Sequence, residues 1–180
     1  MKVIRFILPL IVLSALLFVG YHMVELSRQQ KKKIEKITHL PLFELKDMQG
    51  KLFTNANLKK GAPVVFLYFN SECEFCQTEI ENIVTNIQKF DGVQLVFVSI
   101  EPIQKIIMFQ TTHKLDIYDN TIFLSDYRNI FSEIFDVNIF PSSLVYNKNG
   151  MLLSRNNGAV KANYLLKILK NNKIRNRSTD

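Results

Sequence analysis

The chain has 180 residues, of which 47% are apolar and 22% charged, and its formal net charge is +7. This length suits one domain with a short appendage, and the apolar fraction excludes a wholly disordered chain. Two cysteines exclude a disulfide-rich scaffold and a four-cysteine zinc site. The basic excess lies at the two ends, while positions 38–160 are slightly acidic, so we expect no nucleic-acid partner across the fold.

An uncharged apolar run at positions 6–24 follows Lys2 and Arg5. As a helix it would span roughly 28 Å, which matches the hydrocarbon core of a bilayer. A cleaved signal peptide is the alternative, but the run is long for one and lacks small residues at a cleavage site. We therefore expect residues 1–24 to be a single-pass membrane anchor that contacts the lipid bilayer through residues 6–24.

The charged stretch at 25–38 is expected to form a polar tether, either as a helix or as a solvated segment without a specific partner. Because basic residues lie on both sides of the apolar run, charge alone leaves the membrane orientation open. The domain itself is predicted at 39–171. Residues 172–180 are expected to form a basic, solvated tail.

The domain alternates predicted strands and helices. In chain order we expect a hairpin of 42–45 and 51–53, a strand at 64–69, a helix at 73–89, a strand at 93–100, a helix from Pro102, a strand at 122–124, a helix at 128–135, a hairpin of 143–146 and 151–154, and a helix at 162–170. The unbroken apolar run at 64–69 is typical of a strand buried on both faces. The alternation predicts an α/β fold, a three-layer sandwich with a central mixed β-sheet.

Cys73 and Cys76 form a CxxC pair between the buried strand and the helix that follows it. Loops at the carboxyl ends of strands form the sites of open α/β sheets. Unpaired N–H groups and the positive end of the helix favour a thiolate at Cys73. Cys76 lies one turn later on the same face, so we expect Cys73 to attack and Cys76 to resolve. A metal site would need further ligands, and we expect none.

Phe140 and Pro141 directly precede the apolar run at 142–146, where an ordinary strand would need an N–H donor. A cis peptide there would expose the Phe140 backbone beside the sulfurs, where it would bind an extended substrate. A trans proline that begins an edge strand is the alternative, and the residues alone leave both open. Phe140 is an expected substrate-binding residue, together with Glu74 and Phe75 between the cysteines.

Glu101 follows the predicted strand at 93–100, so it also lies at the carboxyl end of a strand. A partly buried carboxylate at this place would be suited to act as a general base. The alternative is an acid at the start of a helix, before Pro102, that complements the helix dipole. The sequence does not decide between these two roles.

These features together resemble the thioredoxin superfamily, in particular the membrane-anchored thiol–disulfide oxidoreductases of the TlpA and ResA type. The resemblance covers about residues 40–170, nearly all of the predicted domain. It rests on the segments 43–47 with 50–51, 63–69 before the cysteine pair, Glu79 after it, and 140–146 before 148–150. The chain departs from the family's pattern at Glu72, where an aromatic residue is usual, and at Glu74-Phe75, where Pro-x is usual.

The resemblance implies a thioredoxin-like fold preceded by one transmembrane helix, a cis bond before Pro141, and a catalytic set of Cys73, Cys76, Pro141 and Glu101. In this set Glu101 would tune proton transfer at Cys76. The implied activity is reduction of protein disulfides outside the cytoplasm, with no cofactor beyond the Cys73–Cys76 disulfide. The domain would face the periplasm from a bacterial inner membrane, and its partners would be protein disulfide substrates and a membrane or periplasmic thiol donor.

Two other functions fit the same fold. A thiol peroxidase would need a threonine three residues before its reactive cysteine, where this chain has Asn70. A non-enzymatic copper-delivery or assembly factor would need CxxxC and a late histidine, whereas this chain has CxxC and no histidine after His113. These differences count against both functions, which stay as alternatives to the disulfide reductase.

Overall fold

The computed structural model describes residues 4–177, with side chains described at 16–28 and 34–172. The chain divides into two units, Met1–Lys36 and Ile37–Asp180. The predicted tail at 172–180 falls partly outside the described residues.

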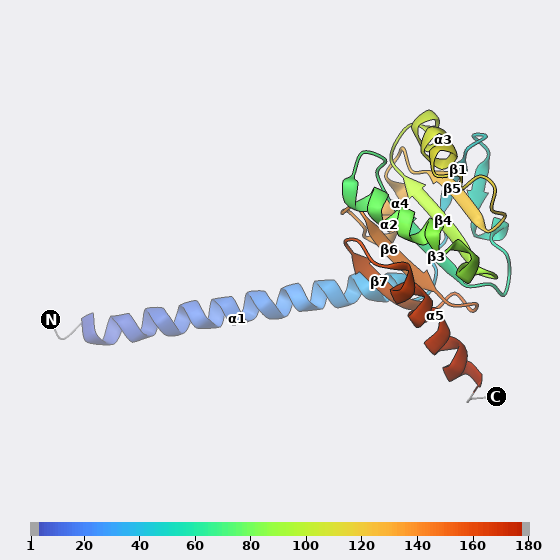
Figure 1. Ribbon diagram of the computed structural model, residues 1–180. Helices are drawn as coiled ribbons and strands as arrows, with labels where there is room; N and C mark the ends of the chain where they lie inside the picture. Colours follow the sequence, from blue (N-terminus) through green and yellow to red (C-terminus); the bar gives the residue numbers. More distant parts are fainter. Residues whose placement is uncertain (1–3, 178–180) are drawn as a thin grey trace. The chain divides into compact units, whose positions relative to one another are not determined.

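The first unit is occupied by helix α1 (Ile4–Ile37), which runs from the predicted anchor through the predicted tether (Figure 1). The tether is therefore helical. Among the described residues, no helix combines the length and the hydropathy needed to cross a membrane. The side chains at positions 6–15, the first part of the predicted anchor, lie outside the described residues.

The second unit is built on one seven-stranded mixed sheet within the described residues, in the order β2-β1-β5-β4-β3-β6-β7 (Figure 1). The strands are β1 (Glu44–Asp47), β2 (Leu52–Thr54), β3 (Val64–Tyr68), β4 (Gln94–Ser99), β5 (Thr121–Ser125), β6 (Ser142–Tyr146) and β7 (Leu152–Asn157). Strands β3, β4 and β5 are parallel, whereas β1 pairs antiparallel with β5, and β6 pairs antiparallel with β3. The predicted mixed sheet is confirmed.

Four further α-helices follow in the described part of this unit. They are α2 (Glu74–Thr85), α3 (Ile103–Thr112), α4 (Ile130–Phe135) and α5 (Ala162–Arg177), with short 3₁₀ helices η1 (Asn55–Asn57) and η2 (Ile87–Phe90). The helix predicted at 73–89 divides because Asn86 leaves the α conformation at φ −111° and ψ 12°, and the chain continues as η2. The helix predicted from 128 begins later because Asn129 is left-handed, at φ 58°.

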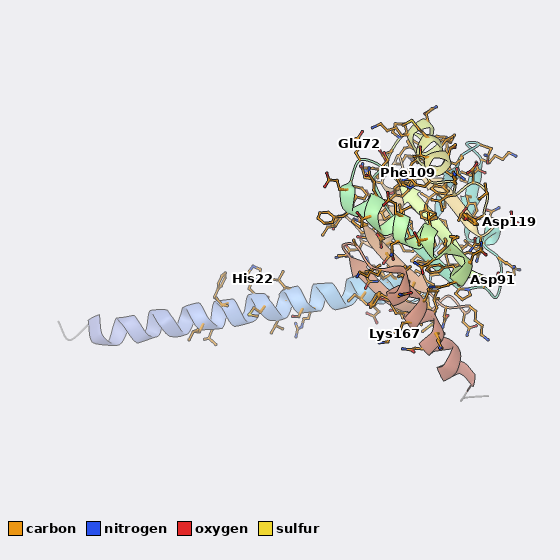
Figure 2. All side chains as sticks on the ribbon, viewed as in Figure 1. His22, Glu72, Asp91, Phe109, Asp119 and Lys167 are labelled. Atoms are coloured by element: carbon orange, nitrogen blue, oxygen red, sulfur yellow. The ribbon has the colours of Figure 1, made fainter. Side chains whose placement is uncertain are left out.

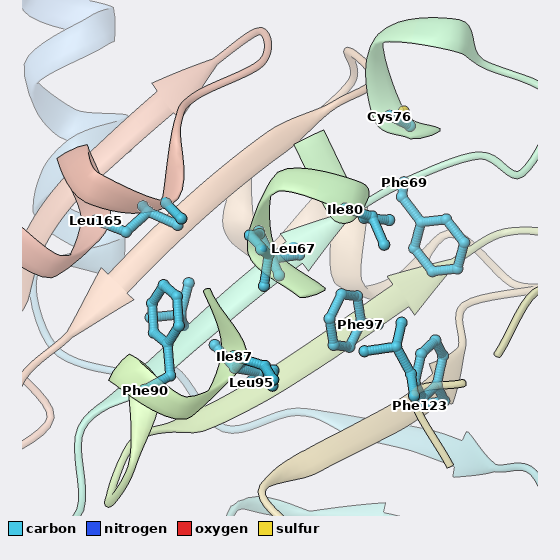
Figure 3. Close-up of a cluster of buried hydrophobic side chains, with 14 of the residues drawn as sticks. Leu67, Phe69, Cys76, Ile80, Ile87, Phe90, Leu95, Phe97, Phe123 and Leu165 are labelled. Carbon is cyan, nitrogen blue, oxygen red and sulfur yellow. The ribbon is translucent and has the colours of Figure 1, made fainter. Parts of the chain in front are cut away.

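Successive side chains of β3 enter two separate apolar clusters, because neighbouring residues of a strand point to opposite faces. On one face, Val65 and Leu67 pack in a cluster with residues of α2, α3 and α5 (Figure 3). On the other face, Phe66 packs against Phe131 and Phe135 of α4, with ring centroids 5.4 Å apart in both pairs. Helices therefore cover both faces of the sheet, which explains why every residue of β3 is buried.

Replacing Phe97 of β4 by alanine tests the first cluster. Phe97 is fully buried and stacks on Phe123 with centroids 4.6 Å apart. We expect Phe97→Ala to lower the free energy of unfolding by about 3–5 kcal/mol, measured by denaturant titration. The matched control is Phe75→Ala, whose side chain is 71% exposed and whose effect should stay within about 0.5 kcal/mol. Equal losses in the two variants would contradict this core.

Candidate active site

The two cysteines lie where the chain leaves β3 and begins α2. Cys73 is the N-cap residue of α2, and its sulfur accepts a hydrogen bond from the Cys76 N–H at 3.4 Å. Both cysteines are free thiols; Cys73 is half-buried and Cys76 has no solvent exposure. The structure thus places one accessible sulfur at the helix N-terminus, with a buried sulfur one turn behind it.

The surroundings of Cys76 make its thiol hard to ionise. Cys76 lies in the first cluster beside Phe69 and Ile80, as Figure 3 shows. Burial raises the pKa of this thiol, and the nearby Glu79 adds to the effect, while a hydrogen bond from the Asn70 backbone opposes it. A group in this position needs a base to remove its proton before it can attack. The geometry therefore assigns first contact with a partner to Cys73.

The Phe140–Pro141 peptide bond is cis, as the resemblance implies. The Cys73 thiol donates to the carbonyl oxygen of Phe140 at 3.9 Å, and the carbonyl of Pro141 accepts from the Gly158 N–H at 2.8 Å. The ring of Phe140 lies against Tyr68, with centroids 4.8 Å apart. Phe140 thus presents its backbone, rather than its ring, to the accessible sulfur.

The two residues between the cysteines are exposed on the first turn of α2. Glu74 is its first residue, and the Phe75 ring is 71% exposed. Both side chains expected to bind substrate are therefore available to an incoming partner. The carboxylate of Glu74 also lies at the end of the helix where the dipole favours negative charge.

A buried carboxyl group on α2 lies near the buried cysteine, Cys76. Glu79 is only 3% exposed, and its Oε1 accepts a hydrogen bond from the Val160 N–H at 3.2 Å. Burial raises the pKa of Glu79 to about 7, against the opposing effect of that hydrogen bond. A carboxyl group that titrates near neutral pH is suited to exchange a proton with Cys76. Sequence reasoning gave it no role, although an acid three residues after Cys76, among the buried Ile80 and Ile83, was a usable signal.

Glu101 is also buried, but it faces different partners. Its carboxylate accepts from the Ser71 N–H at 2.7 Å, the Ser71 hydroxyl at 2.6 Å and the Ser99 hydroxyl at 3.1 Å. Among the described interactions, Glu79 is the carboxylate whose charge acts on the Cys76 thiol. The structure therefore brings Glu101 to the loop before Cys73 rather than to the sulfur of Cys76.

The outer end of that loop carries Glu72, labelled in Figure 2. Its carboxylate is 2.5 Å from the Lys105 ammonium of α3, and this contact lowers the pKa of Glu72. Both side chains are exposed, so water screens their attraction and we expect the pair to contribute little to stability. The sequence shows only two acids beside Cys73; the fold adds a compensating cation.

Metal-ligating side chains do not gather here. Across the described residues, no group of three His, Cys, Asp or Glu side chains is placed to hold a metal ion. The imidazole of His113 lies against the Phe109 ring, with centroids 4.3 Å apart, and His39 bridges to Met151 through its backbone.

The family of the chain follows from a family model that matches residues 38–155 and is described as the AhpC/TSA family. The chain belongs to the AhpC/TSA family. The matched segment includes the cysteine pair, the cis proline and both buried glutamates. No curated protein matches the chain at a significant level of sequence similarity.

Solved structures show the fold of this AhpC/TSA member independently. A putative thioredoxin from Neisseria meningitidis superposes with a TM-score of 0.64 at 22% identity, covering 79% of this chain and 93% of that one. A secreted Mycobacterium tuberculosis disulfide oxidoreductase homologous to E. coli DsbE gives 0.62 at 19% identity, covering 76% and 98%. Peroxidoxin BcpB from M. tuberculosis gives 0.64 at 19% identity, covering 74% and 94%. The AhpC/TSA member thus has the thioredoxin-superfamily fold, and its family is one of redox enzymes.

The pKa of Glu79 predicts a pH-dependent stability. Because the folded chain keeps the Glu79 proton up to about pH 7 while the unfolded chain releases it near 4.5, the fold loses stability as pH rises between these values. Glu79→Gln keeps an oxygen for the Val160 N–H but has no proton to lose. We expect the free energy of unfolding of the wild type to fall relative to Glu79→Gln by on the order of 3 kcal/mol across this window.

Denaturant titrations at several pH values measure this difference. Glu81→Gln, an exposed acid on the same helix, is the control and should follow the wild-type curve. Parallel curves for the wild type and Glu79→Gln would show that Glu79 titrates like an exposed carboxyl group.

Proposed function

We propose that the protein is a thiol–disulfide oxidoreductase that reduces protein disulfides with Cys73 as the attacking and Cys76 as the resolving residue. The observation that carries the proposal is the unequal placement of the two sulfurs on one helical turn. Cys73 is half-buried at the N-terminus of α2, whereas Cys76 has no solvent exposure. A partner can therefore reach the sulfur of Cys73, whereas the sulfur of Cys76 is reached only from inside the protein.

The exchange proceeds in two displacements. The thiolate of Cys73, stabilised by the Cys76 N–H, attacks one sulfur of the substrate disulfide. The substrate S–S bond breaks, a mixed disulfide forms, and the leaving thiolate takes up a proton. Cys76 then gives its proton to ionised Glu79 and attacks Cys73, which breaks the mixed disulfide. The released substrate thiolate takes that proton from Glu79, so the substrate leaves as a dithiol, and the enzyme keeps the Cys73–Cys76 disulfide.

An extended segment of a protein substrate would bind beside Phe140. The carbonyl of Phe140 already accepts from the thiol of Cys73 at 3.9 Å, which places this backbone at the site. Strand-like hydrogen bonds to a substrate backbone are independent of its side chains. The exposed Glu74 and Phe75 would then contribute contacts that depend on the substrate sequence.

The direction and place of the reaction belong to the same proposal. The described apolar side chains of α1 at positions 16–24 remain exposed, with Leu17 at 67% and Phe18 at 68%. Together with the TlpA/ResA resemblance, this exposure supports an N-terminal anchor at positions 1–24, with the domain on the periplasmic side of a bacterial inner membrane. A membrane or periplasmic thiol donor would return Cys73–Cys76 to the dithiol form.

A second candidate is a thiol peroxidase, which the AhpC/TSA match and the likeness to a peroxidoxin favour. At the position three residues before Cys73, Asn70 offers an amide in place of a threonine hydroxyl, and its side-chain oxygen accepts from the Glu72 N–H at 2.9 Å. Turnover of hydrogen peroxide by the purified dithiol protein would favour this candidate over the reductase.

Trapping separates the roles of the two cysteines. In a Cys76→Ser variant the mixed disulfide has no resolving thiol, so we expect substrate proteins to remain covalently attached to Cys73. Non-reducing gel electrophoresis followed by mass spectrometry measures the attached proteins. Cys73→Ser is the matched control and should retain none. Equal amounts in both variants would contradict the assigned order of attack.

A fusion at the C-terminus tests the orientation. We expect a reporter enzyme that is active only outside the cytoplasm to be active when fused to the full chain. A second fusion, to a reporter active only in the cytosol, is the control and should stay silent. The reverse pattern would place the domain in the cytosol and reject the periplasmic part of the proposal.

A further inference from the structure

Ser71, two residues before the attacking cysteine, has all of its polar groups engaged. Its N–H and its hydroxyl donate to the Glu101 carboxylate at 2.7 and 2.6 Å. Its carbonyl accepts from the Gln77 side chain of α2 at 2.7 Å. The loop that carries Cys73 is therefore held at Ser71 from two directions.

Glu101 is itself fixed to the end of the sheet. Its N–H donates to the Ser99 hydroxyl at 3.2 Å, and that hydroxyl donates back to the carboxylate at 3.1 Å. The Ser125 hydroxyl donates to the Glu101 carbonyl at 3.4 Å. Ser99 and Ser125 are register partners at the ends of β4 and β5. Glu101 is 6% exposed, so its contacts with the loop are shielded from water.

The position of Ser71 is passed on to Cys73 through one turn of chain. The Asn70 carbonyl accepts from the Cys73 N–H at 3.2 Å, and the Asn70 side chain accepts from the Glu72 N–H at 2.9 Å. A displacement of Ser71 would move this turn as a unit. The sulfur of Cys73 would then lose its alignment with the Cys76 N–H, which stabilises the thiolate.

A second link to the same turn is weaker. Lys105 contacts Glu72 at 2.5 Å and lies 3.9 Å from the Glu101 carboxylate. The Lys105 and Glu72 side chains are exposed, so water and salt screen their attraction. The buried contacts of Glu101 with Ser71 therefore carry the positioning.

We propose that Glu101 is a positioning residue that holds Cys73 in its attacking orientation through Ser71. It takes no part in proton transfer to or from Cys76. The inference rests on the proposed function, because it concerns the sulfur that this function uses. A glutamine at this position would place an amide nitrogen where Ser71 needs an acceptor, since a carboxylate accepts at both oxygens.

The test compares Glu101→Gln, Ser71→Ala and the double variant with the wild type. One readout is the rate at which iodoacetamide alkylates Cys73 in the reduced protein. The other is kcat/KM for reduction of insulin disulfides, measured as a function of pH. Glu81→Gln is the control for loss of a carboxylate and should leave both rates at the wild-type level. Thermal unfolding establishes whether each variant is folded. If Glu101→Gln does not fold, the two rates of Ser71→Ala still test the proposal.

We expect each single variant to lower both rates about tenfold, which corresponds to about 1.4 kcal/mol in the barrier. The double variant should be no slower than the slower single variant, because both changes remove the same contact. The value of kcat/KM should fall by the same factor at every pH, so that the pH–rate profile keeps its shape. A lost limb in Glu101→Gln with an unchanged rate in Ser71→Ala would assign proton transfer to Glu101 instead.

Two further outcomes would contradict the positioning role of Glu101. A double variant about a hundredfold slower would mean that the two residues act independently, and wild-type rates in both single variants would remove the positioning role. Alkylation of Cys73 does not require disulfide exchange. A wild type that fails to reduce insulin disulfides would therefore count against the proposed function, while the alkylation rates still test Glu101.

Discussion

The packing of α2 on the sheet fixes how the two sulfurs differ. Ile80 and Ile83 bury the inner face of this helix in the first apolar cluster, and Cys76 lies on that same face. Cys73, as the N-cap, stands outside the helix proper and keeps part of its surface in solvent. The packing of this one helix therefore produces an accessible sulfur that accepts a hydrogen bond from the Cys76 N–H and a protonated sulfur in the core. The chemistry proposed here depends on that difference.

Two buried glutamates at the site illustrate how partners, rather than residue type, decide a role. Glu79 and Glu101 are 3% and 6% exposed. Glu79 accepts from the backbone N–H of Val160, and burial leaves its pKa near neutral, so it is able to exchange protons. Glu101 accepts hydrogen bonds from Ser71 and Ser99, and the bond to Ser71 holds the loop before Cys73. In the proposed mechanism, one glutamate thus takes the proton of Cys76, whereas the other orients Cys73.

The sequence predicts those elements whose structure depends on residues that are neighbours along the chain. The apolar run of β3, the helix after Cys73 and the turn at Gly150 all follow from neighbouring residues, and a left-handed φ of 74° at Gly150 explains the glycine. Contacts between residues that are far apart in the sequence cannot be predicted from such local patterns. Glu79 meets Val160, and Glu101 meets Ser71, only because the fold brings segments that are distant in sequence together. The sequence offers Glu101 as one candidate base for Cys76, whereas Glu79 is the carboxylate whose charge acts on that thiol in the fold. The anchor and its orientation stay predictions.

The measurement that tests the central claim most directly is a redox titration of the purified protein. Samples are equilibrated in buffers of defined thiol–disulfide ratio, and their free thiols are then labelled and counted by mass. The account predicts that Cys73 and Cys76 change together, in one two-electron transition between dithiol and internal disulfide. Two free thiols that persist across the whole range, or a single cysteine that forms only external disulfides, would contradict it.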